Sequence, residues 1–449
     1  MEINEHYDVV VVGGGPAGIN AAIAAGRKNM KTLLIERYGF LGGMSTAALV
    51  YPWMTFHTNN GKQVIKGIAQ EIVSRLQERG GSPGHIRDTI GFVYSVTPYH
   101  PEKYIVLAIE MLKEAGVELL LHSFVDNVCV EDDQITSVTV TGKSGRIHIA
   151  GEIFIDATGD GDVSHLAGVP MFKGREKDHK MQPMTMKFRM RGVNTTKITQ
   201  YMIDHPSHFY KKSLIDELKA GKVSLSGVQG FYPQWEKAKL PINRDQVLFF
   251  IGPAEDEVLV NCTRVQGYDG TNVHDLSNAE YEGRKQVLMV ADFLTQHVPG
   301  FEHAAVTTVG TQIGIRETRR IIGHYVLDKE DVVQGRKFDD VIARSGYPID
   351  IHDPTKRGVE FAFVKGDGAF DIPYRCLIPK NVNNLLAAGR CISTTHEAFA
   401  TTRLTPSAMA TGQAAGTAAS LAVEKNVSPA SVEVQDLQDE LKANGAVLE

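Results

Sequence analysis

Cysteine is scarce in this sequence, and its spacing excludes several kinds of redox centre. The 449 residues include four cysteines, at positions 129, 262, 376 and 391, and no Cys-x-x-Cys pair. Iron–sulfur clusters and zinc sites need cysteines grouped at short spacings, and a local redox disulfide needs a neighbouring pair. The sequence therefore predicts a reduced, cytoplasmic chain with no metal centre.

Two further absences narrow the range of partners. Lys and Arg total 47 against 53 Asp and Glu, a net charge of −6, so no nucleic-acid or anionic-membrane partner is expected. The longest stretch of small residues, 404–423, contains Pro406, Thr411 and Gln413, which indicates a buried helix rather than a membrane span. The few residues before the first apolar run leave no room for a signal peptide.

The order of apolar runs predicts an α/β fold. A strand at 7–12, a helix at 16–28 and a strand at 31–36 make a βαβ unit, and a helix at 101–115 leads into another strand at 117–121. Four shorter strands then indicate a β-meander that returns to the sheet. They are expected at 125–130, 135–141, 146–149 and 152–156.

The chain is too long for one ordinary core, and its pattern changes in the middle. Between residues 167 and 371, strands of mixed polarity (185–191, 247–250 and 258–262) alternate with polar helices such as 278–297, and a loop rich in Pro and Asp covers 347–354. A buried strand at 385–388 and a small-residue helix at 407–423 resume the first pattern. We therefore predict a discontinuous Rossmann-type domain (1–166 and 372–425), an inserted mixed α+β substrate domain (167–371) and a C-terminal helical tail (426–449).

A G-x-G-x-x-G motif connects the first strand to the first helix. Gly13 permits the tight turn, Gly15 lets the backbone approach a pyrophosphate, and Gly18 lets the helix pack on the strand. The helix N-terminus, at Pro16, offers free N–H groups to phosphates. Glu36 ends the second strand, where a carboxylate can accept hydrogen bonds from a ribose. Together these features predict dinucleotide binding, with a purely structural glycine turn as the alternative.

Three further turns favour FAD over NAD. Gly42 and Gly43 follow the second strand, where paired glycines let the chain track the middle of a long cofactor. Ala157-Thr158-Gly159 ends another strand and brings backbone close to the cofactor, although the acidic residues after it can instead cap a short helix. Gly389-Arg390 precedes a helix that we expect Thr405 to cap, and the dipole of this helix can face the flavin N1/C2=O edge.

These motifs resemble those of the FAD-dependent oxidoreductases of the glutathione-reductase-like superfamily. The likeness is greatest to the branch with a single Rossmann domain, and more distant to the FAD-binding part of heterodisulfide reductase. It covers nearly the whole chain and includes IRETRR at 315–320, YPIDIH at 347–352 and TGQAAG at 411–416. The resemblance implies non-covalent FAD but no particular substrate. The residues expected at FAD are Gly13, Gly15, Pro16, Ala17, Gly18, Glu36, Arg37, Gly42, Gly43, Met44, Ser45, Val125, Ala157, Thr158, Gly159, Asp162, Gly389, Arg390, Thr405 and Ser407.

Five polar residues are candidates for contact with a substrate. Arg316 can clamp an acidic group, unless it belongs to an internal ion-pair cluster. His352 has carboxylates beside it that can tune it for acid–base work, or it is a surface histidine. His57 follows the cofactor loop, and His396 and Arg403 lie between Gly389 and the last helix of the Rossmann-type domain.

The predicted function is hydride transfer between a small organic substrate and FAD, because the flavin carries such chemistry. No second G-x-G-x-x-G motif with an acidic strand end is present, so the electron donor or acceptor is unidentified. Three alternatives stay open at this point. They are a flavin monooxygenase that uses NAD(P)H and oxygen, an FAD-bearing electron-transfer subunit with an iron–sulfur partner, and a redox-inert FAD scaffold. Assembly as a homo-oligomer also stays open.

Overall fold

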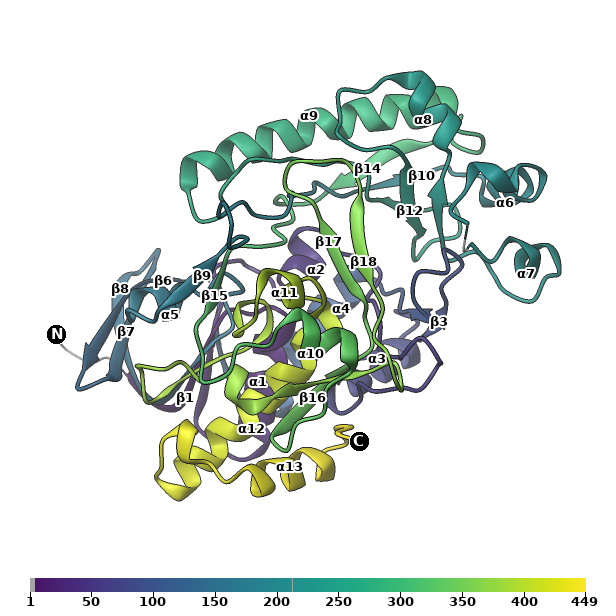
Figure 1. Ribbon diagram of the computed structural model, residues 1–449. Coiled ribbons are helices and arrows are strands. Elements are labelled where there is room, and N and C mark those ends of the chain that lie inside the picture. The colour runs from purple at the N-terminus through teal and green to yellow at the C-terminus, as the bar shows by residue number, and fades with distance from the viewer. Residues whose placement is uncertain (1–4, 212) are drawn as a thin grey trace.

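The computed structural model describes residues 5–211 and 213–449, and its centre is a seven-stranded sheet (Figure 1). Five strands are parallel, and two more turn back as an antiparallel meander, which confirms the predicted Rossmann-type α/β architecture. The residues ahead of position 5, to which the expectation of no signal peptide refers, lie outside the described part. In spatial order the strands are β5 (Glu118–Leu120), β2 (Thr32–Ile35), β1 (Glu5–Val12), β8 (Gly145–Asp156), β7 (Gln134–Gly142) and β6 (Phe124–Glu131), with β20 (Leu385–Ala387) paired to β8.

The first strand is buried on both faces of this sheet. Val9 and Val11 pack in the larger hydrophobic core, whereas Val10 and Val12 pack in a second core on the opposite face. A strand with two buried faces needs a continuous apolar run rather than an alternating one. The unbroken valine run therefore accounts for the central position of β1.

Helices α1 and α12 cover one face of the sheet and pack directly against each other (Figure 1). α3 and α4 lie against them, and α13 packs on the outer side of α12. The contact between α1 and α12 is close because α12 carries Gly412 and Gly416 on the facing side. The helices of this layer are α1 (Pro16–Arg27), α3 (Ile68–Glu78), α4 (Pro101–Glu114), α12 (Thr405–Lys425) and α13 (Val434–Ala443).

The meander differs from the prediction in one respect. The expected strands 146–149 and 152–156 are a single strand, β8, which runs from Gly145 to Asp156. Its first half pairs antiparallel with β7, and its second half pairs parallel with β1 and β20. One long strand thus belongs to both the meander and the parallel sheet, and a glycine at position 151 does not interrupt it.

A second, five-stranded antiparallel sheet forms the inserted unit at the top of Figure 1. The long helix α9 covers it and begins at Val273, five residues before the predicted start, because the Asn272 side chain accepts hydrogen bonds from the first-turn N–H groups. The strands are β11 (Gly227–Gly230), β12 (Val247–Ile251), β13 (Val258–Val260), β10 (Phe188–Arg191) and β14 (Ala305–Val309). The helices are α6 (Thr195–Asp204), α7 (Ile215–Lys219), α8 (Tyr232–Ala238) and α9 (Val273–His297).

The segment between the insert and β20 is more regular than expected. The predicted loop at 347–354 contains a strand, β17 (Ile349–His352), which pairs antiparallel with β18 (Val359–Ala362). This hairpin extends from the Rossmann-type domain toward the inserted sheet (Figure 1). The remaining elements are α2 (Met44–Ala47), β3 (Ile86–Arg87), β4 (Ser95–Val96), α5 (Asp162–Leu166), β9 (Met171–Lys173), β15 (Arg319–Ile321), α10 (Lys329–Gln334), β16 (Val341–Ser345), β19 (Phe370–Pro373) and α11 (His396–Thr402).

The hydrophobic cores suggest tighter domain limits than the sequence pattern does. The core of the inserted sheet draws on buried residues from Met184 to Ile315. Buried residues from Leu327 to Ile378 pack instead in the larger core with α1 and α12, and so do Leu437 and Leu441 of α13. We therefore propose that the inserted unit is 184–315 rather than 167–371, and that the tail belongs to the first domain.

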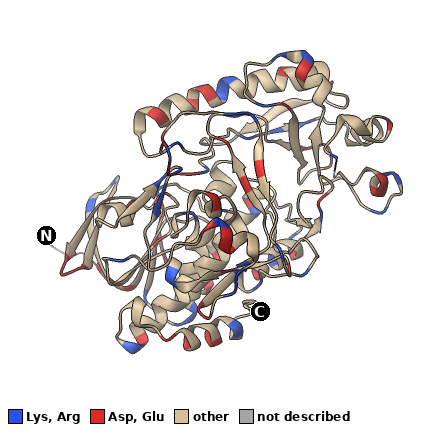
Figure 2. Cartoon of the chain, in the orientation of Figure 1, with Lys and Arg blue, Asp and Glu red and all other residues tan. Residues whose placement is uncertain are grey.

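None of the helices in the described ranges is both long and apolar enough to cross a membrane. Acidic and basic residues are interspersed along α9 and the lower helices rather than gathered on one basic face (Figure 2). The distribution agrees with the small negative net charge of the chain.

The close approach of α12 to α1 generates a first prediction. A Cβ at Gly416 would lie 2.1 Å from the Ala21 carbonyl oxygen, so the helices must separate in a Gly416→Ala variant. We expect the free energy of unfolding to fall by about 1–3 kcal/mol, the usual cost of overpacking a core. Urea unfolding of Gly416→Ala measures this change, with Ala410→Ser on the partly exposed side of α12 as the control. Equal effects of the two substitutions would contradict the tight contact.

Candidate active site

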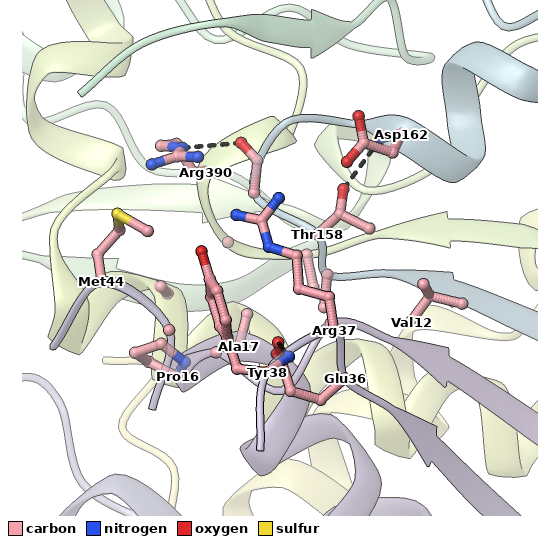
Figure 3. Close-up of a pocket in the computed structure, with 18 of the residues that line it drawn as sticks. Val12, Pro16, Ala17, Glu36, Arg37, Tyr38, Met44, Thr158, Asp162 and Arg390 are labelled. Atoms are coloured by element: carbon pink, nitrogen blue, oxygen red, sulfur yellow. Dashed lines mark hydrogen bonds between the residues drawn. The ribbon is translucent and has the colours of Figure 1, made fainter. Parts of the chain in front are cut away.

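Turns that are far apart in sequence meet at the carboxyl edge of the parallel sheet. β1 ends at Val12 opposite Asp156 of β8, and Ala387 of β20 pairs with the same Asp156. The turns after these strands enclose a groove of about 960 Å³ (Figure 3). Crevices beyond the carboxyl ends of parallel strands are where α/β folds bind ligands.

Most of the residues expected at FAD line this groove. Those that do are Gly13, Gly15, Pro16, Ala17, Glu36, Arg37, Gly43, Met44, Ser45, Val125, Ala157, Thr158, Gly159, Asp162, Gly389, Arg390 and Thr405. The lining residues that were not expected there are Val12, Ile35, Tyr38, Ser123, Phe124, Ala388, Arg403 and Ala408. Most of these unexpected residues are adjacent in sequence to an expected one. Their positions beside the glycine-rich turns could therefore have predicted them.

Three expected residues do not line the groove. Gly18 faces the β1 turn, where a Cβ would lie 1.8 Å from the Gly13 carbonyl oxygen, so its role is helix packing. Gly42 has a φ of +106° and lies against the Thr46 side chain, so it shapes the loop. Ser407 is buried, and its Oγ is 3.1 Å from the Ser345 Oγ.

Gly13 and Gly15 in the first turn are glycine for different reasons: the fold requires the first, and a ligand would require the second. Gly13 has a φ of +104°, and a Cβ there would lie 2.5 Å from the Ala157 carbonyl oxygen, so the fold itself requires glycine. Gly15 has a φ of −77°, which any residue adopts, and a Cβ would meet only Gly43, at 3.8 Å. The fold itself therefore does not require glycine at position 15. A pyrophosphate bound against the backbone in the groove would require it, because a side chain there would occupy the same space.

Two helices begin at the groove, and no side chain caps either of them. α1 starts at Pro16 after Gly15, and α12 starts at Thr405 after Leu404. Thr405 is thus the first helical residue rather than the predicted cap. Uncapped N-termini present free N–H groups and positive dipole ends, which suit the phosphates of a dinucleotide and the electron-rich edge of a reduced flavin.

Glu36 holds the loop that follows β2. Its carboxylate oxygens accept hydrogen bonds from the backbone N–H of Gly14, at 2.7 Å, and of Tyr38, at 2.8 Å. Burial raises the pKa of Glu36, although these N–H donors oppose the effect. A carboxylate has about four acceptor positions, so the predicted contact with a ribose remains compatible with both bonds.

Arg390 ties the last turn to the turn after β8. Its Nε donates to the Gly159 carbonyl oxygen at 2.8 Å, and its other nitrogens contact the carboxylate of Asp160 and the Ile315 carbonyl oxygen. Asp162 pairs with Arg319, yet burial and the neighbouring Asp160 raise the pKa of Asp162 to about 6. The first-turn N–H groups of the short helix after Gly161 donate to the side chains of Thr158 and Asp156, so neither Asp160 nor Asp162 has the capping role considered above.

A second cavity, of about 1440 Å³, opens beside the groove. The two hollows share Met44, Arg390, Arg403 and Thr405 as a common wall. The far wall comes from the inserted sheet, and the side walls come from the β17–β18 hairpin and from residues 48–54. A cofactor in the groove and a substrate in the cavity would therefore meet at this common wall.

The cavity is lined largely by apolar residues, and most of its charged side chains are cations. Five cationic residues line it in addition to Arg390, against the carboxylates of Asp245 and Asp350. The Arg316 guanidinium donates to the Pro183 carbonyl oxygen at 2.5 Å and to Thr185 Oγ1 at 2.6 Å. Burial and nearby cations, Arg403 first, lower the pKa of Arg316 to about 9. The five cationic residues are Lys187, Arg244, Arg264, Arg316 and Arg403.

His352 and Asp350 form a pair on β17 that faces the cavity. The Asp350 Oδ2 is 3.6 Å from His352 Nε2 and accepts a hydrogen bond from the Tyr347 hydroxyl at 3.0 Å. Burial, helped by Arg316, lowers the pKa of His352 to about 3, so its imidazole is neutral at neutral pH. Burial opposes ionisation of Asp350, but His352, Arg403 and the Tyr347 hydroxyl lower its pKa.

The other two candidate histidines line neither hollow. His57 Nδ1 is 2.8 Å from Ser95 Oγ, next to the β3–β4 hairpin, and its ring lies against His85. His396 is buried, with Nδ1 2.8 Å from the Glu317 carboxylate, which also pairs with Arg320. The side chains of both histidines therefore contact neighbouring protein groups rather than the groove or the cavity.

Sequence reasoning missed Lys187, Arg244, Arg264 and Tyr347. Each comes from the insert or the hairpin, where no motif marks which side chains face inward. One signal was available: Lys187 lies between Met186 and Phe188 at the start of a strand, an unusual place for a lysine. No group of three or more His, Cys, Asp or Glu in residues 5–211 and 213–449 is arranged to hold a metal.

The family model for FAD-dependent oxidoreductases matches residues 8–441. The chain belongs to that family. It is an FAD-dependent oxidoreductase, and the groove with its four converging turns is the place in the fold that suits FAD.

Similarity to curated proteins is partial. The chain is 23% identical over 181 residues to digeranylgeranylglycerophospholipid reductase 1 of Methanococcoides burtonii (37% of this chain, 41% of that one). It is 30% identical over 166 residues to thiamine thiazole synthase of Methanococcus vannielii (34% and 56%), and 43% identical over 77 residues to ferredoxin–NADP reductase of Levilactobacillus brevis (17% and 22%). The matches thus span between about a fifth and a little over half of these relatives.

Among solved structures, p-nitrophenol 4-monooxygenase of Pseudomonas putida matches with a TM-score of 0.50 and 10% identity, over 99% of this chain and 87% of that one. Because only 10% of the aligned residues are identical, this match supports a common fold and says nothing of a common substrate or reaction.

The contrast between Gly13 and Gly15 yields a second prediction. We expect Gly15→Ala to unfold at the wild-type temperature without cofactor, because the protein leaves space for the methyl group. Its affinity for FAD should fall at least about tenfold, which is 1.4 kcal/mol. Gly13→Ala should lose both stability and binding, because its backbone angle is strained. Flavin fluorescence titration and thermal unfolding separate the two cases, and unchanged FAD affinity in Gly15→Ala would count against the assigned groove.

Proposed function

We propose that this enzyme oxidises or reduces a small organic acid, which binds as an anion in the cavity beside the cofactor groove. The observation that carries this proposal is the set of five cationic side chains that line the cavity together with only two carboxylates. Burying unpaired charge is costly, so such a set favours a negatively charged ligand. Arginine suits carboxylates in particular because its planar donors can bind both oxygens.

FAD fits the groove on three counts given above: the space at Gly15, the uncapped starts of α1 and α12, and Glu36 at the end of β2. When bound, FAD accepts or donates a hydride. The residues that would hold it are those of the first turn, of the Arg37–Met44 loop and of the Gly389–Arg390 turn. The α12 N-terminus would favour negative charge at the common wall.

Arg403 and Arg316 are proposed to orient the substrate carboxylate. Arg403 lies on the wall shared with the cofactor groove, so an anion bound to it would lie at the cofactor end of the cavity. Arg316 is fixed by two hydrogen bonds through one nitrogen, which leaves the rest of its guanidinium for a ligand. Fixed donors reduce the reorganisation needed to bind the reacting molecule.

His352 is proposed to take or return the substrate proton. Its Nε2 faces Asp350, so the proton would be held at Nδ1, and the carboxylate would stabilise the imidazolium. A bound anion offsets the positive charge of Arg316 and Arg403, which raises the pKa of His352 from its low value in the empty cavity. In oxidation, an O–H or N–H proton would pass to His352 while the neighbouring C–H gives up its hydride.

We also propose a family branch, a cellular location and an external electron partner for this enzyme. The β-meander and the single nucleotide motif support a place in the single-Rossmann branch of the glutathione-reductase-like superfamily. The four free cysteines support a cytoplasmic location. The second electron donor or acceptor is proposed to be external, because the sequence contains a single G-x-G-x-x-G motif followed by an acidic strand end.

Anaerobic mixing of the FAD-loaded enzyme with matched acids, alcohols and amines tests the proposal. We expect loss of the oxidised-flavin absorbance with an acid, or return of that absorbance when an acid oxidises the reduced enzyme. Neutral amides of the same acids should be inert. Turnover of neutral compounds with no preference for acids would contradict the proposed function.

Removal of the cation at the common wall gives a third prediction. We expect Arg403→Met to raise the KM for the acid at least about tenfold, because one charge contact of 1.4 kcal/mol or more is lost. Arg403→Lys should recover part of this loss. Steady-state kinetics at matched FAD content measures the effect, and an unchanged KM in Arg403→Met would remove Arg403 from the substrate site.

The buried lysine gives a fourth prediction, on pH dependence. Burial, together with Arg316, Arg403 and Arg244, lowers the pKa of Lys187 to about 7. Below this pH the side chain is a cation that attracts the acid, and above it the charge is lost. The Kd for the acid should therefore rise between about pH 7 and pH 8, as Lys187 loses its proton. Isothermal titration measures it, and Lys187→Met should remove the dependence; a wild-type Kd that falls above pH 7 would contradict the assignment.

A further inference from the structure

The cations of the substrate cavity come from different parts of the fold. Arg403 lies at the cofactor end, on the wall shared with the groove. Arg244 precedes β12 and Arg264 follows β13 of the inserted sheet, and both line the cavity but not the groove. Lys187 and Arg316 line the cavity as well.

Several of these groups have donors without partners. The Nε atoms of Arg403 and Arg264 are buried with no hydrogen-bond partner, although Nη2 of Arg264 donates to the backbone carbonyl oxygens of Asp353, Lys356 and Gly358. Lys187 is 9% exposed, and within the described residues its ammonium group has no hydrogen bond or ion pair. Buried donors are nearly always satisfied in native proteins, so both ends of the cavity need acceptors from a ligand.

The charges also fail to balance. Asp245 is exposed, and Asp350 is already engaged by Tyr347 and His352. Apart from Arg390, which pairs with Asp160, five cations stand against two carboxylates and leave an excess of three positive charges, or of two when Lys187 is neutral. A ligand with a single negative charge would leave part of this excess uncompensated.

We propose that the substrate is an organic dianion whose two anionic groups are separated, that is, a dicarboxylate. One carboxylate binds at Arg403 next to the cofactor, and the second binds at Arg244 and Arg264. This inference rests on the proposed function and extends it, because it adds a second anion subsite. A phosphate monoester also carries two charges, but on one compact group, so it would not supply the two separated anionic groups that the proposal requires.

Ligand binding to the FAD-loaded enzyme tests this arrangement without turnover. The probes are succinate, propionate, succinamide and inorganic phosphate, measured by isothermal titration and by the shift in the flavin spectrum. We expect succinate to bind at least about tenfold more tightly than propionate. Succinamide should show no measurable binding, and phosphate should bind more weakly than succinate.

Variants at the far wall identify the second subsite. Arg244→Met should reduce the affinity for succinate to that for propionate and leave propionate binding unchanged, whereas Arg244→Lys should keep most of the preference. Lys197→Met, on the exposed surface of the same inserted unit, is the matched control and should match the wild type. Flavin content and thermal unfolding show whether each variant is folded, and Arg264→Met provides a second, independent removal of a far-wall cation.

Equal affinities for succinate and propionate, or tighter binding of phosphate, would overturn the second subsite while leaving the proposed function intact. Binding of succinamide as tight as that of succinate would overturn both. Loss of the succinate preference in Arg244→Met or Arg264→Met, with FAD bound, supports the subsite. Retention of the full preference in both folded variants refutes it.

Discussion

Parallel pairing of β1 and β20 with β8 is the constraint on which the site depends. Val12 and Ala387 both align with Asp156, so three segments that are far apart in sequence end at one edge. The turns that follow then close around a single groove. α12 packs on α1 through glycines, which holds its N-terminus at this edge. A change in the register of β8 would move the Ala157–Gly159 turn away from the other two.

The inserted sheet contributes residues to a second cavity, whose lining differs from that of the groove in the Rossmann-type domain. The groove is built mainly from backbone and small residues, which suit a large cofactor, whereas the cavity has a largely apolar lining into which several long cationic side chains are set. Arg403 and Thr405 belong to both hollows, so the chemistry is expected where two different environments meet. The excess of buried positive charge is unfavourable for the empty protein, and this cost argues that the cavity evolved around an anion.

Much of the lining of the candidate cofactor groove could be predicted from the sequence, because it lies at strand ends marked by glycine. The turns at Gly13–Gly18, Gly42–Gly43, Ala157–Gly159 and Gly389–Arg390 all come to the same edge. The exceptions are instructive: Gly18 and Gly42 serve packing and loop shape, which the sequence pattern cannot distinguish from ligand contact.

The substrate side was harder to predict. β17 was expected to be a loop because Pro348 and two aspartates interrupt its apolar pattern, yet pairing with β18 outweighs these local preferences. Lys187, Arg244 and Arg264 are brought together by an antiparallel sheet whose long-range pairing has no sequence signature. His57 and His396 were selected by position along the chain, whereas tertiary contacts with Ser95 and Glu317 decide where they point.

A crystal structure of the enzyme with FAD and a bound acid is the most direct test of the central claim that cofactor and substrate meet at Arg403. The account predicts the isoalloxazine at the wall formed by Met44, Arg403 and Thr405, with a carboxylate of the acid within hydrogen-bond distance of Arg403. An isoalloxazine outside this junction, or an acid bound elsewhere with the cationic cavity filled only by water, would contradict it.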